Sequence, residues 1–190
     1  MDIGIDEAGR GCWAGPVFAA AVIWPKDISP MGITDSKKLS EKQRYKLRDY
    51  IQDNAIEWAV GMSSSEEIDK VNILNATFLA MHRALDKIKN EIIFIKIDGN
   101  RFNGYNDIPH ECIIKGDTKC VSISAASILA KTYKDDYIRD LCLENPNLDE
   151  RYGWLNNKCY GTKIHKKGIQ LYGITPYHRK SYKPCQLPEK

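Results

Sequence analysis

Four acidic residues of this 190-residue chain stand where short apolar segments end. They are Asp6, Glu7, Asp98 and Asp117. If the segments are neighbouring strands of one sheet, the carboxylates meet at the edge where open α/β sheets bind their ligands. Carboxylates gathered in this way repel one another and raise each other's pKa unless cations compensate them. The pattern therefore predicts a site for divalent cations.

The residue types favour hard cations. No His or Cys adjoins the four acids, which favours Mg²⁺ or Mn²⁺ over zinc. Two such ions ~4 Å apart can activate a water nucleophile and stabilise the leaving oxygen in phosphodiester hydrolysis. Taken alone, each acid is more often a solvated surface residue. Asp135 and Asp136 are rival acids for the position given to Asp117, but they lie well inside a predicted helix, where we expect a solvated face.

A glycine-bearing turn, Gly9-Arg10-Gly11, follows the first two acids. Its backbone can approach a phosphate or a sugar closely because glycine has no side chain. The other end of the chain is strongly basic. Residues 151–190 hold nine Lys and Arg and one acid, a net charge of +8, whereas the whole chain carries +3. An acidic centre beside a basic tail suits a polyanionic substrate.

Hydrophobic spacing predicts the elements that must hold these residues. A capping-box pattern at Ser40 and Gln43 opens one helix, and apolar residues spaced by three and four from Leu74 to Ile88 mark one face of another. The β-branched run over 92–97 is typical of a parallel strand covered on both faces. We expect strands over residues 1–6, 17–23, 57–62, 92–97 and 111–115, the first two antiparallel, and helices over 40–53, 74–88 and 122–143.

Length and composition favour one α/β domain. A chain of 190 residues with 43% hydrophobic residues can bury one sizeable core, and we expect residues 145–190 to be a basic C-terminal extension of the same domain. The six cysteines form no C-x-x-C pair, which argues against a zinc ribbon or a disulfide framework. The sequence shows neither a leader-peptide pattern nor a membrane-length apolar run, so we expect a cytoplasmic protein without membrane association.

Taken together, the motifs resemble those of the ribonuclease HII family, the type 2 ribonucleases H. Six matching stretches run in order through nearly the whole chain. They are residues 6–11 (DEAGRG) with 14–16 (AGP), 35–40 (DSKKLS), 98–101 (DGNR), 115–117 (KGD), 123–131 (ISAASILAK), and the tail group of 160–162 (YGT), His165 and 178–181 (HRKS). The resemblance implies a ribonuclease H-like mixed five-stranded sheet flanked by helices, with a helical C-terminal extension.

By the same resemblance, the four acids are catalytic and bind two divalent ions, Mn²⁺ or Mg²⁺. Asp6 would bridge both ions. Strand alternation should turn the side chains of Asp6 and Glu7 apart. Glu7 could then contribute through its backbone carbonyl or from a bent strand end, and the sequence leaves both routes open.

The resemblance also implies how substrate is held. Gly9, Arg10 and Gly11 match the segment that senses the ribose 2′-OH, the group that distinguishes RNA from DNA. Tyr160 matches the tyrosine that packs on the deoxyribose after the ribonucleotide, although Cys159 stands before it where we expect a glycine. Further substrate-binding candidates are Lys37, Lys38, Asn100, Arg101, Lys163, Lys166, His165, Arg179 and Lys180. For His165, a position near the metals, a phosphate contact and a structural hydrogen bond all remain open.

The implied activity is endonucleolytic. The enzyme would cut the phosphodiester 5′ to a ribonucleotide in RNA–DNA hybrids or in duplex DNA, leave 3′-OH and 5′-phosphate ends, and so remove ribonucleotides from DNA. We expect a monomer without the N-terminal domain of type 3 enzymes, since the first acid is residue 6. Two alternatives are another metal-dependent nuclease, which would cut RNA-free DNA equally well, and a binding module without catalysis.

Overall fold

A computed structural model describes residues 1–186. Its centre is a five-stranded sheet in the order β3-β2-β1-β4-β5. The strands are β1 (Asp2–Ala8), β2 (Val17–Ile23), β3 (Glu57–Ser63), β4 (Phe94–Asp98) and β5 (His110–Ile113). β2 pairs antiparallel with β1 and β3, whereas β4 pairs parallel with β1 and β5. The structure confirms the mixed five-stranded sheet.

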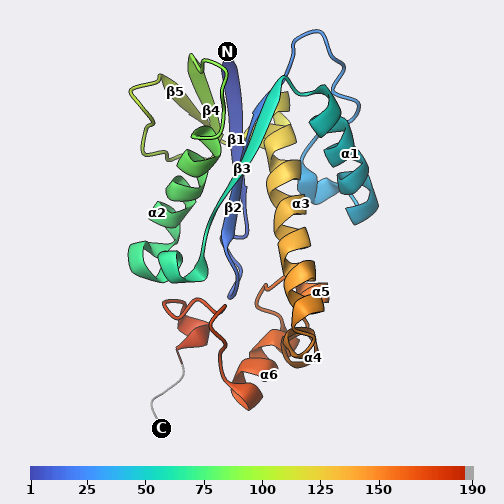
Figure 1. Ribbon diagram of the computed structural model, residues 1–190, viewed down its shortest axis with the longest axis vertical. Helices are drawn as coiled ribbons and strands as arrows, with labels where there is room; N and C mark the ends of the chain where they lie inside the picture. The colour runs from blue at the N-terminus through green and yellow to red at the C-terminus, as the bar shows by residue number, and fades with distance from the viewer. Residues whose placement is uncertain (187–190) are drawn as a thin grey trace.

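Helices cover both faces of this sheet (Figure 1). α2 packs on one face, while α3 packs on the other and carries α1 on its outer side. Three short helices continue beyond the end of α3. The helices are α1 (Glu41–Asn54), α2 (Ser65–Leu85), α3 (Val121–Glu144), α4 (Asn147–Tyr152), α5 (Trp154–Asn157) and α6 (Lys163–Tyr172), with single 3₁₀ turns η1 (Ser36–Lys38), η2 (Gly116–Thr118) and η3 (Lys183–Cys185).

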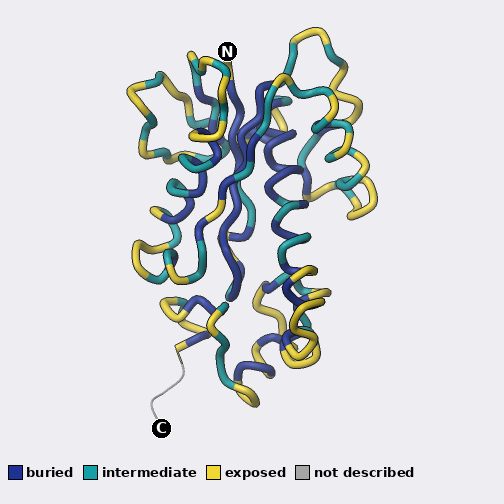
Figure 2. Tube along the Cα trace, viewed as in Figure 1, coloured by how far each residue is buried: buried dark blue, intermediate teal, exposed yellow. Residues whose placement is uncertain are grey.

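The alternation of β1 separates the two layers of the core. Ile3 and Ile5 join the cluster that faces α2, so Gly4 and Asp6 point to the α3 side. A Cβ on Gly4 would lie only 2.4 Å from backbone and side-chain atoms of Ser122. The small residues at the start of α3 therefore allow close helix-to-sheet packing. Figure 2 shows the result as a continuous buried band along the central strands and the inner side of α3.

α2 is two helical segments joined at a kink. Asn72 has φ 68°, and its side-chain Oδ1 accepts hydrogen bonds from the N–H groups of Leu74 and Asn75. This is the N-cap arrangement, so the second segment starts where the apolar periodicity predicts a helix. The first segment, from Ser65, was not predicted. It begins with a capping box of its own, in which Ser64 and Glu67 bond each other's backbone N–H.

The prediction of a solvated face at Asp135 and Asp136 is wrong. Asp135 is only 2% exposed and forms ion pairs with Lys134 at 3.0 Å and Lys131 at 3.2 Å. Asp136 ties α3 to α1 through Arg48 and Tyr45. Basic side chains therefore pair with both carboxylates, the buried Asp135 and the partly buried Asp136.

The C-terminal part, α4 to η3, is attached to the loop that follows β1. Two isolated β-bridges join Cys12 to Tyr160 and Ala14 to His178. On the opposite side, the Asp69 carboxylate of α2 accepts hydrogen bonds from the N–H groups of Lys180 and Ser181. Within residues 1–186, no helix combines the length and apolar character that a membrane crossing requires.

Candidate active site

Asp6 and Asp98 come together because β1 and β4 are parallel neighbours. The last residues paired between these strands are Ile5 and Ile97, and each acid directly follows one of them. Asp6 is only 5% exposed and faces α3, where Ser127 lines the same cavity. The Ser127 hydroxyl is itself hydrogen-bonded to Ser36 at 2.8 Å. The first acid is therefore enclosed between the sheet and α3.

Glu7 occupies the opposite side of the strand end. Its backbone N–H donates to Asp6 Oδ1 at 2.7 Å, while its side chain lies 3.3 Å from the Arg10 guanidinium. The Glu7 side chain also borders a cavity against Phe78 of α2. The predicted divergence of the two side chains is confirmed. Glu7 nevertheless borders the same cavity as Asp6, because β1 ends at the next residue, Ala8.

The turn after β5 brings Asp117 toward Asp98. The N–H of Gly116 donates to Asp98 Oδ1 at 2.7 Å. A Cβ on Gly116 would lie 2.7 Å from Ile123 and 3.3 Å from that oxygen, so only glycine fits this contact without a shift. Asp117 is itself 5% exposed, and its backbone carbonyl accepts the Ser124 hydroxyl at 2.7 Å. The structure thus gathers all four predicted acids at one end of the sheet.

The electrostatics of these acids is unfavourable without a cation. Burial raises the pKa of Asp6 well above its ordinary value, and the charges of Glu7 and Asp98 raise it further. Burial likewise raises the pKa of Glu7. The pKa of Asp117 is raised by burial and then by Asp98 and Asp35. A hard divalent cation would relieve this repulsion with ligands of the type it prefers.

The donor set therefore fits Mg²⁺ or Mn²⁺, but it is not a finished coordination shell. In the described part of the chain, no three acidic, His or Cys side chains converge as a preformed ligand set. Two carboxylates are bonded elsewhere, Glu7 to Arg10 and Asp98 to Gly116. Binding a cation would have to draw these groups together.

A cavity of about 230 Å³, called the main cavity below because it contains the acids, joins them to the glycine turn. Asp6, Glu7 and Asp98 form its acidic wall. The remaining lining residues are Ala8, Gly9, Arg10, Gly11, Ser36, Lys37, Ser127, Lys131 and Tyr160. The structure thus brings Gly9, Arg10, Gly11, Tyr160 and Lys37 to the acids, as one site requires.

A second cavity, of about 290 Å³, lies on the other side of Glu7 and Asp98. It contains Asn100 and Arg101, and α2 forms its apolar floor with Phe78 and Met81. Lys38 and Lys163 are exposed but line neither cavity. Lys166 and Lys180 are exposed as well.

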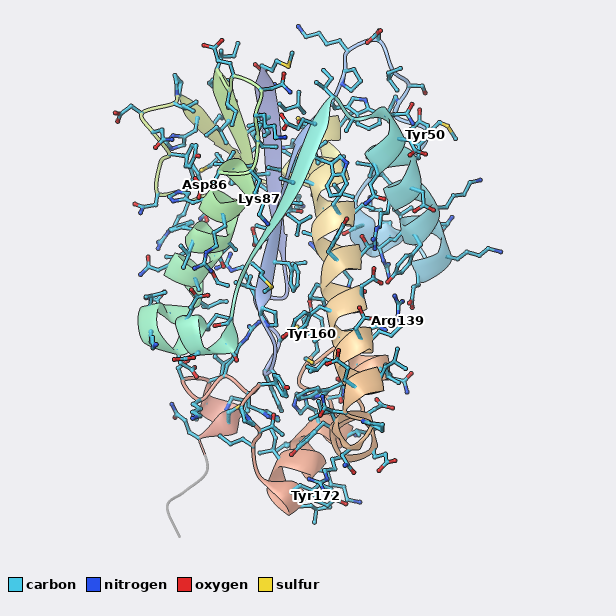
Figure 3. The ribbon with its side chains drawn as sticks, viewed as in Figure 1. Tyr50, Asp86, Lys87, Arg139, Tyr160 and Tyr172 are labelled. Atoms are coloured by element: carbon cyan, nitrogen blue, oxygen red, sulfur yellow. The ribbon has the colours of Figure 1, made fainter. Side chains whose placement is uncertain are left out.

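Tyr160 is presented from the C-terminal part to the glycine turn. It is 39% exposed, and Figure 3 shows it beside α3 near the end of the sheet. Lys134 Nζ lies 4.9 Å from the centre of its ring. Cys159 adopts φ 67°, in the left-handed region that glycine enters without strain. The cysteine therefore keeps the loop conformation that a glycine would favour, and its side chain is fully buried.

Sequence reasoning missed three residues of this site. Lys131 and Ser127 line the main cavity, and the Asp35 carboxylate is close enough to Asp117 to raise its pKa. All three lie inside stretches that match the family, 35–40 and 123–131. Their spacing of four places Ser127 and Lys131 on one helix face, a signal that could have been used.

Of the three roles left open for His165, the structure shows the structural hydrogen bond, and its assignment as a substrate contact is wrong. The side chain is fully buried and lies among aromatic rings. Its Nε2 accepts from Trp154 Nε1–H at 3.2 Å, so its Nδ1 carries the proton and donates to the Tyr160 carbonyl at 3.1 Å. His178 then donates from Nε2 to His165 at 3.1 Å, and its Nδ1 accepts from the Thr175 N–H at 2.9 Å. Two neutral histidines thus support the Tyr160 loop.

This network predicts acid-sensitive stability. Burial and the neighbouring His165 lower the pKa of His178 from 6.5 to about 4. Between these pH values the unfolded chain binds a proton that the folded chain does not. The contribution of neutral His178 to the free energy of unfolding is therefore fully present above pH 6.5 and is lost as the pH falls toward 4. The loss amounts to about 3 kcal/mol. Urea denaturation across this range should show the loss in wild type and a flatter profile in His178→Gln. Equal pH profiles would contradict this protonation scheme.

Arg179 is also wrongly predicted as a phosphate contact. Its side chain is fully buried, and its guanidinium donates to the backbone carbonyls of Gly9, Arg10 and Gly15. A duplex phosphate cannot reach it. The arginine instead supports the glycine turn from behind.

The sheet order, the helices on both faces and the acids at the ends of β1 and β4 are those of the ribonuclease H fold class. Two solved structures share the fold. The ribonuclease H2 from Pyrococcus horikoshii has a TM-score of 0.75 at 24% identity, over 97% of this chain and 95% of that one. The Bst-RNase HIII structure in complex with Mn²⁺ has a TM-score of 0.69 at 21% identity, over 97% of this chain and 68% of that one.

Sequence comparison is more specific. A sequence profile of the family described as Ribonuclease HII matches residues 3–185. The Ribonuclease HII of Parabacteroides distasonis is 58% identical over 190 residues, which span all of this chain and 92% of the relative. That of Neisseria meningitidis is 49% identical over 188 residues, which span 98% of this chain and 94% of the relative. The chain belongs to the ribonuclease HII family of RNase H-type endonucleases.

Proposed function

We propose that this endonuclease recognises ribonucleotides paired with DNA, including a single ribonucleotide in duplex DNA, and hydrolyses the phosphodiester on its 5′ side. The products would carry 3′-OH and 5′-phosphate ends. The observation that carries the proposal is the main cavity itself. Three acids form one wall, and the turn Gly9-Arg10-Gly11 and Tyr160 form the other. Metal chemistry and sugar recognition would then act on adjacent atoms of one strand.

Asp6, Glu7, Asp98 and Asp117 would hold two divalent cations, Mn²⁺ or Mg²⁺. Asp6 is the best candidate for a shared ligand, because its carboxylate interacts electrostatically with both Glu7 and Asp98. When bound, the cations would lower the pKa of a water nucleophile and stabilise charge on the phosphate. The chain's own contribution is to orient Asp6 and Asp98 through the N–H groups of Glu7 and Gly116.

Two ammonium groups would orient the scissile phosphate. Lys37 and Lys131 both line the main cavity. Burial and the adjacent Lys134 lower the pKa of Lys131, and its Nζ lies 3.3 Å from Asp135 Oδ1. A phosphate in the cavity would supply a second anionic partner. Such contacts give positioning without reading the base sequence.

The exposed basic residues would bind the rest of the duplex. They include Lys38, Arg101, Lys163, Lys166 and Lys180. The described part of the C-terminal extension, residues 145–186, would form part of this surface, and its contacts should weaken with salt. We further propose that the chain acts as a monomer in the cytoplasm and removes ribonucleotides from DNA.

Product mapping tests this proposal. A duplex with one central ribonucleotide is labelled at either end and incubated with enzyme and Mg²⁺ or Mn²⁺. One cut, on the 5′ side of the ribonucleotide, is expected, and the upstream product should be extendable by a DNA polymerase because it ends in 3′-OH. A cut on the 3′ side, or a 3′-phosphate end that blocks extension, would contradict the proposal.

A further inference from the structure

The glycine turn is held from behind by a single buried arginine. Arg179 Nη2 donates to the Gly9 carbonyl at 2.7 Å, and Nη1 donates to the Arg10 carbonyl at 2.8 Å. Its Nε donates to the Gly15 carbonyl at 3.0 Å. The guanidinium thus grips both ends of the loop between β1 and β2. Arginine suits this position because its planar, forked donors remain charged when buried.

Tyr182 completes the grip. Its hydroxyl donates to the Arg10 carbonyl at 2.6 Å and accepts from Arg179 Nη1 at 3.0 Å. The segment that carries both residues is anchored at a distance from the turn. The Asp69 carboxylate accepts the N–H groups of Lys180 and Ser181 at 2.9 and 2.8 Å. The segment 179–182 therefore connects α2 to the turn.

These hydrogen bonds fix the direction in which the backbone N–H groups of the turn point. Every described peptide bond is trans, so each carbonyl points opposite to the N–H of the next residue. Because the Gly9 and Arg10 carbonyls point to Arg179, the N–H groups of Arg10 and Gly11 point away from it. No acceptor within residues 1–186 pairs with either N–H, and both residues line the main cavity.

The buried charge also strengthens these donors. Hydrogen bonds from a charged donor are shorter and stronger than neutral ones, and a chain of bonds polarises its members. The Gly9–Arg10 and Arg10–Gly11 peptides, whose carbonyls face the guanidinium, each carry one of the two outward N–H groups. An oxygen that arrives in the cavity would meet two prealigned, polarised donors.

From this geometry we propose that Arg179, together with Tyr182, is the positioning residue that sets discrimination between ribose and deoxyribose. It aims the Arg10 and Gly11 N–H groups at the 2′-oxygen and touches neither the substrate nor the acids. The inference rests on the proposed function, because it assumes a ribonucleotide beside the turn. Loss of Arg179 should weaken recognition of the 2′-OH more than it weakens binding of the duplex.

Binding measurements separate these effects. The Asp6→Asn protein, in Mg²⁺, is the non-cleaving background, and its Kd is measured for a duplex with one ribonucleotide and for the same duplex in all-DNA form. The Kd for the all-DNA duplex divided by the Kd for the ribonucleotide duplex is the preference ratio, and it reports recognition of the 2′-OH. Adding Arg179→Gln should lower this ratio at least about tenfold while the all-DNA Kd changes less than about twofold, as expected when prealigned donors are lost. Lys89→Gln, an exposed position outside the C-terminal extension with the same change in charge, should leave both values unchanged.

Tyr182→Phe keeps the test valid if Arg179→Gln fails to fold. It removes one hydroxyl from the same carbonyl and should lower the ratio about threefold, the effect of one lost hydrogen bond. A folded Arg179→Gln or Tyr182→Phe protein with an unchanged ratio would overturn the inference. Equal weakening of both duplexes would do the same, since it would indicate a merely structural role. If the background protein itself shows no preference for the ribonucleotide, the proposed function fails instead.

Discussion

The Asp6→Asn protein should fold normally and cleave a ribonucleotide-containing duplex at least about 10³-fold more slowly than wild type, the scale of loss when a reaction centre loses an essential group. Asp6 is the most buried of the acids at the end of β1 and is in charge interaction with both Glu7 and Asp98. The substitution keeps the shape of the side chain but removes the charge. Single-turnover cleavage measures the effect.

Stability provides an internal control for this variant. Burial and two neighbouring charges raise the pKa of Asp6, so its ionised form is unfavourable when no cation is bound. Without added metal, Asp6→Asn should therefore melt at the same temperature as wild type or higher. Asp140→Asn, which changes an exposed acid of α3, should retain full activity. Wild-type cleavage rates in Asp6→Asn would refute the metal assignment.

Removal of divalent cations should abolish cleavage, and their return should restore it. The repelling carboxylates also predict a readout that needs no substrate. A cation that binds only the folded protein stabilises it by about 2.7 kcal/mol at one hundred times its Kd, which raises the melting temperature by about 5–11 °C for a chain of this size. Thermal unfolding with and without Mg²⁺ or Mn²⁺ measures this shift.

The same titration in Asp6→Asn distinguishes a specific site from general ion effects. The variant lacks the central carboxylate, so its shift should be much smaller than that of wild type. Sodium chloride at equal ionic strength, without a divalent cation, is the control for screening of the carboxylate charges by salt. Cleavage that persists in excess chelator, or equal shifts in both proteins, would contradict cation binding by these acids.

Much of the framework was predictable because it depends on local patterns. The capping box at Ser40 and the β-branched run before Asp98 each place an element from a few adjacent residues. The acids could be placed together because parallel strands end at one edge of the sheet. The prediction that Asp6 and Glu7 diverge followed from strand alternation alone.

Two of the errors concern polar side chains whose partners lie on other elements of the fold. Arg179 bonds to Gly9, 170 positions away, and no local pattern distinguishes such an arginine from a solvated one. His165 was ambiguous for the same reason, because Trp154 and His178 define its role only after the C-terminal helices assemble. Asp135 was misjudged because a charged residue inside a helix is usually solvated. Arg179 and His165, both in the basic tail, thus support the site from inside the protein.

The most direct test of the central claim is the cleavage rate of one duplex in two forms, identical except for the 2′-OH of a single nucleotide. The account predicts rapid, metal-dependent cutting of the ribonucleotide form and no cutting of the all-DNA form under the same conditions. Comparable cutting of both forms would contradict it, since the main cavity would then hold a nuclease site without recognition of the sugar.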